Sequence, residues 1–116
     1  MTRIFNVIDD NGRRTSFKVQ DFGSQFLISQ DGCQIITADD EQSAQNAVEC
    51  MMKDNGWHLE ELIDLDGDYS TAITFERTDP ETVIVKTFEW MGGRYVQLGP
   101  EDRYSVELAA AEYGYR

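Results

Sequence analysis

Asp64, Asp66 and Asp68 place three carboxylates at alternate positions of one short segment, which is the closest approach to a ligand motif in this chain. Carboxylate oxygens at this spacing can converge on a hard cation such as Ca²⁺. The same residues surround Gly67, and an Asp-Gly pair favours the tight turn of a β-hairpin, in which aspartates stabilise the backbone. We interpret the segment as a hairpin turn and keep a cation site as the alternative.

From Asp64 onward the segment resembles the first half of an EF-hand calcium loop. Tyr69 occupies the sixth place, where that family needs glycine for its sharp turn, and Phe75 occupies the twelfth place, where it needs a bidentate glutamate. A calcium-binding module therefore remains an alternative with an incomplete ligand set. We expect no metal and no cofactor.

His58 is the only histidine, and Cys33 and Cys50 are the only cysteines. A histidine base needs a nucleophile within reach, yet no local signature such as Gly-x-Ser-x-Gly or His-Glu-x-x-His is present. The cysteines are 17 residues apart and lack the paired spacing of a zinc site or a redox motif. We expect a surface histidine and two reduced, partly buried thiols. A small enzyme that uses His58 or a cysteine remains an alternative to the favoured interpretation, in which the chain is not an enzyme.

Residues 39–68, the acidic block, contain ten acidic residues and one base, Lys53. This quarter of the chain carries −9 of the net charge of −12. So high a charge attracts basic protein surfaces over roughly a Debye length, about 8 Å at physiological salt. The residues that we expect to contact such a partner are Asp39, Asp40, Glu41, Glu60, Glu61, Asp64, Asp66 and Asp68.

A small, strongly acidic chain with aromatic residues at its turns and no catalytic motif resembles the phage-encoded inhibitors that mimic nucleic acid, anti-CRISPR proteins among them. The resemblance covers size and charge only. It implies carboxylates where a nucleic-acid-binding protein expects phosphates, held by charge-assisted hydrogen bonds to arginine and lysine. The function expected from it is a non-enzymatic inhibitor that engages the basic nucleic-acid-binding surface of a partner, such as a CRISPR-Cas effector. The alternative is an immunity protein or antitoxin that neutralises a nuclease toxin.

Composition excludes several other classes of partner. A chain of 116 residues with a pI near 4.2 fits a single domain, residues 1–116, and opposes direct binding to nucleic acid or anionic lipid, which depends on lysine and arginine. No window approaches 18 consecutive apolar residues, and the amino terminus lacks the pattern of a signal peptide. We therefore expect a cytoplasmic protein without membrane contacts.

The elements that position these residues follow from four turn dipeptides. They are Asn11-Gly12, Asp31-Gly32, Asp66-Gly67 and Gly92-Gly93, and each is flanked by segments rich in β-branched and aromatic residues. Acidic residues at a helix start and apolar residues at helical spacing predict helices over residues 40–54 and 100–113. The order reads ββββα twice, an α+β fold in which an antiparallel sheet of successive hairpins buries one face against two helices.

Two strands carry more specific expectations. In Trp57–Leu65, alternation places Leu59 and Ile63 on one apolar face, interrupted by Glu61, although helical spacing fits as well. The Asp-Gly turn that follows favours a strand. In the strand before Gly92, alternation predicts that Phe88 and Trp90 pack in the core rather than form an exposed anchor.

Overall fold

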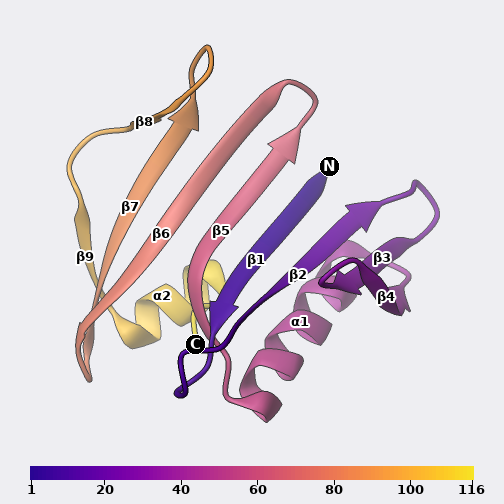
Figure 1. Ribbon diagram of the computed structural model, residues 1–116, viewed down its shortest axis with the longest axis horizontal. Helices are drawn as coiled ribbons and strands as arrows, with labels where there is room; N and C mark the ends of the chain where they lie inside the picture. The colour runs from indigo at the N-terminus through magenta and orange to yellow at the C-terminus, as the bar shows by residue number, and fades with distance from the viewer.

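The structure is a computed structural model that describes all 116 residues, and it is an α+β fold. An antiparallel sheet of nine strands carries both helices on one face (Figure 1). The first half of the chain forms β1 (Thr2–Ile8), β2 (Arg14–Asp21), β3 (Phe26–Gln30), β4 (Cys33–Ala38) and α1 (Glu41–Asn55). The second half forms β5 (His58–Asp66), β6 (Tyr69–Asp79), β7 (Thr82–Trp90), β8 (Tyr95–Gln97), β9 (Asp102–Ser105) and α2 (Val106–Tyr113). The predicted fold class is confirmed, because strands hold 53% of the residues and helices 20%.

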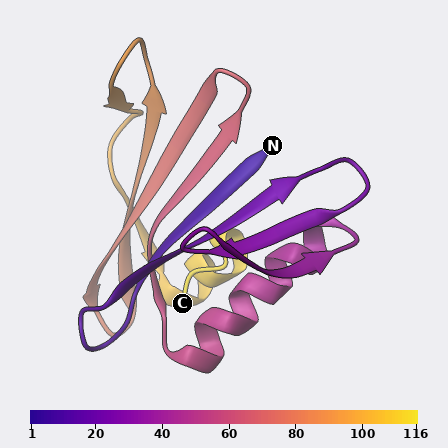
Figure 2. The same ribbon diagram turned by 45° about the vertical axis from the view of Figure 1, so that its right-hand side comes forward.

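The two halves of the chain build the sheet outward from its centre. The strand order is β4-β3-β2-β1-β5-β6-β7-β8, with β9 pairing with β7 beside β8. Each half therefore runs by hairpins from a central strand, β1 or β5, to an edge, and ends in a helix (Figures 1 and 2). The predicted ββββα order is found in the first half, while the second half contains the additional strand β9.

Three of the four predicted turn dipeptides lie between paired strands, and the fourth begins at Asp66, the last residue of β5, so all four hairpins are confirmed. The turn between β3 and β4 shows why these residue types matter. Asp31 has φ 48° and Gly32 has φ 86°, and a two-residue hairpin turn of the primed type needs positive φ at both central positions. Asp31 is the only residue other than glycine with positive φ, as expected for a side chain that tolerates the left-handed region.

The hydrophobic core lies between the sheet and the helices. Alternation along β1 and β2 buries Phe5 and Phe17 side by side on the helix-bearing face. In α1, Ala44, Val48 and Met52 recur every four residues and are completely buried against them. Burial of this apolar stripe, rather than helix propensity, holds α1 on the sheet.

The second helix starts later than the sequence predicts, at Val106 rather than near residue 100. Residues 102–105 form β9 instead, in which Arg103 pairs with Ile84 and Tyr104 with Val83. Pairing with a neighbouring strand has overridden the helical signal of Pro100 and the acids that follow it. Ser105 then caps α2, because its hydroxyl accepts a hydrogen bond from the Leu108 N–H at 3.1 Å.

The segment after α1 is a strand, β5, but its predicted apolar face is wrong. The pairing of β5 with β1 is irregular at Glu60. Asn6 of β1 lies opposite Glu61, but the next residue, Val7, lies opposite Leu59, so that Glu60 is an extra residue without a partner in β1. Such a β-bulge resets the alternation. As a result Leu59 and Leu62 both reach the core, whereas Ile63 lies on the other face of the sheet, the open face.

Trp90 is 43% exposed, so its predicted place in the core is wrong. It lies at the end of β7 opposite Tyr95, whose ring contacts it edge-on with centroids 5.2 Å apart. The Tyr95 hydroxyl shares a hydrogen bond of 2.6 Å with the Ser70 hydroxyl. The alternation of β7 is as predicted, but the face on which Trp90 lies carries no helix.

Cys33 and Cys50 are unpaired, but both are exposed, so their predicted partial burial is wrong. Cys50 lies between Val48 and Met52 of α1 but outside their buried stripe, and Cys33 starts an edge strand. Because no disulfide contributes to the fold, we expect a thiol reductant to leave the melting temperature of freshly prepared protein unchanged. Calorimetry with and without reductant checks this, and a drop in melting temperature on reduction would contradict it.

Candidate functional site

The structure divides the acidic block between the two faces of the sheet. Glu61 lies opposite Asn6 on the open face, whereas Asp64, three residues later in β5, lies opposite Arg3 on the helix-bearing face. Glu60 is the bulged residue between β5 and β1. The acidic residues that lie closest together in the sequence therefore do not share one surface, because successive side chains of a strand point to opposite faces.

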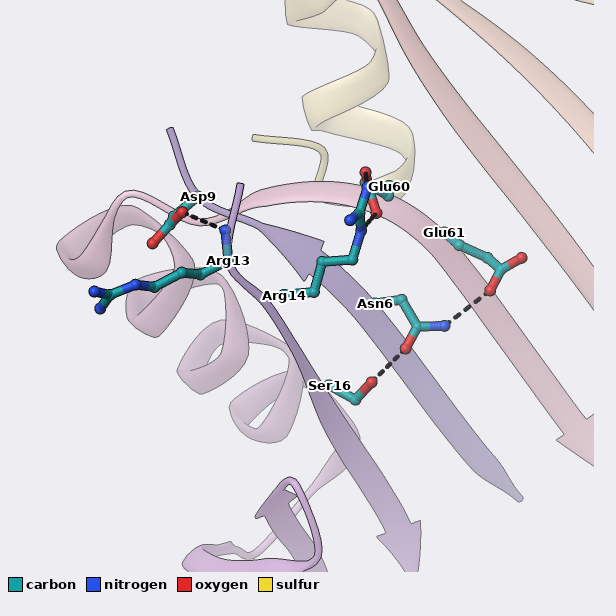
Figure 3. A network of polar contacts seen from close by, with 7 residues as sticks. All are labelled: Asn6, Asp9, Arg13, Arg14, Ser16, Glu60 and Glu61. Atoms are coloured by element: carbon teal, nitrogen blue, oxygen red, sulfur yellow. Dashed lines mark hydrogen bonds and ion pairs between the residues drawn. The ribbon is translucent and has the colours of Figure 1, made fainter. Parts of the chain in front are cut away.

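Glu60 and Glu61 already have partners within the chain (Figure 3). The Asn6 side-chain amide accepts a hydrogen bond from the Ser16 hydroxyl and donates one of 2.8 Å to Glu61. Arg14 holds both carboxylate oxygens of Glu60, at 3.1 and 3.2 Å. Hydrogen bonding to Glu60 raises the pKa of Arg14 above its usual value. This network ties β2, β1 and β5 together on the open face and leaves these two carboxylates engaged.

On the helix-bearing face, Arg3 gathers polar groups from two elements. Its Nε lies 2.8 Å from Asp64 Oδ1 in β5, and a terminal guanidinium nitrogen lies 3.4 Å from Glu41 Oε1 at the start of α1. Its other terminal nitrogen donates to Gln45 Oε1 at 3.2 Å. With only 24% of its side chain exposed, Arg3 holds a strand carboxylate and a helix carboxylate at one site.

A cleft of about 450 Å³ lies between α1 and α2 beside Arg3. Leu62 and Ile73 of the sheet line it, together with Gln42, Gln45 and Glu49 of α1 and Ala111, Glu112, Tyr113 and Gly114 at the end of α2. A second hollow of about 460 Å³ shares Arg3, Gln42 and Gln45 with it and adds Asp40 and Glu41. We call the two hollows together the acidic cleft. Its charged residues are Asp40, Glu41, Glu49, Asp64 and Glu112 around the single base Arg3.

Gly114 allows the two helices to close the cleft at one end. It ends α2 with φ 71° and donates its N–H to the Ala110 carbonyl at 2.9 Å. A Cβ at this position would lie 2.9 Å from Gln45 Nε2 and would overlap the Glu49 carboxylate. Glycine is therefore needed both for the left-handed backbone and for the close approach of Glu49.

Two groups of the cleft have shifted pKa values. Asp40 caps α1 by accepting a hydrogen bond of 2.7 Å from the Ser43 N–H, and this bond lowers the pKa of the Asp40 carboxyl. Burial and a hydrogen bond with Tyr104 raise the pKa of Tyr113. At neutral pH Asp40 is therefore an anion beside the helix start, where the helix dipole favours it, and Tyr113 is a neutral hydroxyl.

The other predicted contact residues lie outside the acidic cleft. Asp39 is exposed just before the cap of α1, Asp66 ends β5, and Asp68 lies in the exposed turn between β5 and β6. Asp64 is engaged with Arg3, and no group of three or more histidine, cysteine, aspartate or glutamate side chains is arranged to hold a metal ion. The three aspartates of the calcium alternative thus do not form a ligand cluster.

His58 is a surface residue beside an acid, as the sequence suggests, but its partner is Asp10. Its Nε2 lies 2.9 Å from Asp10 Oδ1 across the turn after β1, and 43% of its side chain is exposed. Neither residue is joined to a nucleophile by a hydrogen bond.

Three charged residues of the acidic cleft are not among those predicted from the sequence. Arg3 is far from the acidic block in the chain, Glu49 lies within the block but outside its two densest clusters, and Glu112 lies beyond it. The spacing of Gln42, Gln45 and Glu49 at i, i+3 and i+7 marks one polar face of α1 and is the signal that the sequence offers. No pattern in the sequence indicates that Glu112 lies beside that face of α1.

No protein-family description, curated protein or solved structure matches this chain. Neither helix has the length and apolar character needed to cross a bilayer.

Proposed function

We propose that this protein is a non-enzymatic inhibitor that binds another protein, and that the acidic cleft takes basic side chains from that partner's nucleic-acid-binding surface. The observation that carries the proposal is the excess of carboxylates in the cleft. Five acidic residues surround one arginine, and that arginine is already bound to Asp64 and Glu41. The cleft therefore has negative charge in excess of its internal partners.

The shape of the cleft supports a side chain as its occupant. Leu62 and Ile73 give it an apolar floor, while most of the carboxylates lie on or beside the two helices and Asp64 lies on β5. A lysine or arginine combines an apolar stem with a charged head, so it matches both parts of such a site. An arginine fork can also bind two carboxylate oxygens at once, the geometry with which it otherwise holds phosphate.

Long-range charge supports the same partner. The net charge of −12 steers a basic surface toward the molecule, which speeds association and makes it sensitive to salt. A protein that binds nucleic acid carries such a basic surface by necessity. We therefore also propose that this protein competes with nucleic acid for the partner, so that the bound partner no longer binds nucleic acid.

Affinity capture from cells, with the protein as bait, is the experiment that tests this function. We expect the retained protein to have a basic nucleic-acid-binding surface, to elute as salt is raised, and to lose nucleic-acid binding when the bait is present. Its identity separates an effector of the CRISPR-Cas kind from a nuclease toxin. If the captured protein still binds nucleic acid fully in the complex, the proposed function is wrong.

Substitution of Gly114 tests the contribution of Glu49 to binding. Gly114→Ala and Gly56→Ala both place alanine at a left-handed helix end, which costs about 1–2 kcal/mol of stability. Only at Gly114 would the new Cβ displace Glu49, since nothing lies within 4 Å of a Cβ at Gly56. We therefore expect similar melting temperatures but weaker partner binding for Gly114→Ala, measured by calorimetric titration. Equal affinities for the two variants would show that the position of Glu49 is unimportant.

A further inference from the structure

β4 forms one edge of the sheet, and no strand or helix pairs with its outer side (Figure 2). Its residues from Cys33 to Thr37 are all exposed, and Ile35 and Ile36 retain exposed fractions of 42% and 40%. An edge strand presents a row of unpaired backbone N–H and C=O groups to solvent, and these groups can pair with another chain. Here two large apolar side chains accompany them.

The opposite edge of the sheet is protected in ways that β4 is not. There β7 is covered by β8 and β9, which have three and four residues, and β9 begins with the charged pair Asp102 and Arg103. Short strands and charged side chains are common means of preventing edge pairing. β4 has six residues, without charge and without proline. Its one irregularity is a bulge at Ile35, where the pairing with β3 shifts register.

The charge of the whole molecule identifies the partner that fits this edge. The chain has a net charge of −12, so two copies repel each other over most of their surfaces. Residues 22–38, which contain β3 and β4, hold a single charged residue, Asp31, although 28% of the whole chain is charged. This edge is therefore the place where two copies meet with the least repulsion.

We propose that β4 pairs antiparallel with β4 of a second copy about a two-fold axis. The two sheets then form one continuous sheet through both molecules, with Ile35 and Ile36 of one copy packed against those of the other. A two-fold interface uses the same patch twice, and antiparallel pairing of identical strands satisfies that requirement directly. This inference does not rest on the proposed function.

The pairing leaves both acidic clefts accessible. The first hollow of each cleft lies between α1 and α2 and the second lies beside Arg3 at the start of α1, whereas the new pairing uses the outer edge of β4. The dimer would thus present two clefts to one partner or to two. Two linked sites bind a repeated surface more tightly than one, without any new contact at either site.

Sedimentation equilibrium tests the dimer with the intact chain alone. We expect the dimer fraction to rise with protein concentration and also with salt, because salt screens the repulsion between two acidic copies. Salt should have the opposite effect on the proposed function, because it weakens binding of a basic partner to the acidic cleft. Failure of the dimer proposal can therefore be distinguished from failure of the proposed function. A chain that stays monomeric at every salt concentration up to about 1 mM protein would overturn the inference.

Lysine substitutions at the edge locate the interface. Ile36→Lys places like charges near each other across the two-fold axis, and we expect it to raise the dimer dissociation constant at least about tenfold. Ile35→Lys serves as a second variant. Leu108→Lys is the matched control, because Leu108 is an equally apolar residue of α2 that is 53% exposed. If the two edge variants weaken the dimer no more than this control does, the interface lies elsewhere.

Discussion

We expect the basic partner to bind at least about a hundredfold more weakly when glutamine replaces all three of Glu41, Glu49 and Glu112. These carboxylates line the acidic cleft from both helices, and each would face a lysine or arginine of the bound partner. Glutamine keeps the size of the side chain and removes only its charge. The variant loses the ion pair of Arg3 with Glu41 but keeps the shorter one with Asp64, at 2.8 Å. Calorimetric titration of the captured partner measures the effect.

A second triple variant separates the cleft from the total charge. Glu76→Gln, Glu81→Gln and Glu101→Gln also remove three negative charges, from exposed positions outside the acidic cleft. We expect this control to slow association slightly and to leave the dissociation rate unchanged, because it alters only long-range steering. Both triples should fold normally, since relief of like-charge repulsion does not destabilise a strongly acidic protein. Equal losses of affinity in the two triples would mean that net charge alone drives binding.

Truncation of Phe5 is expected to cause a large loss of stability, well above that of any surface substitution. Phe5 is completely buried at the centre of the sheet, between Phe17 of β2 and Leu62 of β5. Phe→Ala changes in such positions cost about 3–5 kcal/mol, because they lose buried area and leave a cavity. Small domains have total stabilities of about 5–15 kcal/mol, so Phe5→Ala should unfold at a much lower denaturant concentration.

Leu108→Ala is the control for this truncation. Leu108 is 53% exposed on α2, and surface substitutions usually change stability by less than about 0.5 kcal/mol. Urea denaturation followed by circular dichroism compares the two variants. A Phe5→Ala protein that unfolds at the same midpoint as Leu108→Ala would contradict the assignment of the core.

The hairpins and the first helix are predictable from the sequence because their signals are local. Asn-Gly, Asp-Gly and Gly-Gly pairs supply the positive φ that tight turns need, and the stripe of Ala44, Val48 and Met52 repeats at helical spacing. The start of α2 and the face of the sheet on which each β5 residue lies are not predictable from local signals. They depend on the pairing of β9 with β7 and on the bulge at Glu60, and both arise from contacts with distant strands.

The candidate site is only partly predictable for the same reason. The sequence locates the charge in residues 39–68, yet it groups Glu60, Glu61 and Asp64 as one cluster. The structure separates them, since Glu60 and Glu61 bind Arg14 and Asn6 while Asp64 binds Arg3. Glu112 joins the cleft from the far end of the chain because α2 packs against β7 and β9, in the second half of the sheet.

The most direct test of the acidic cleft is a nuclear magnetic resonance titration of the labelled protein with its captured partner. We predict that backbone signals change most at the first half of α1 and at the end of α2, around Gln45, Glu49 and Gly114. Signals of the open face, such as those of Asn6, Ser16 and Trp90, should remain in place. Changes concentrated on the open face, with the signals of both helices undisturbed, would contradict the assignment of the acidic cleft as the binding surface.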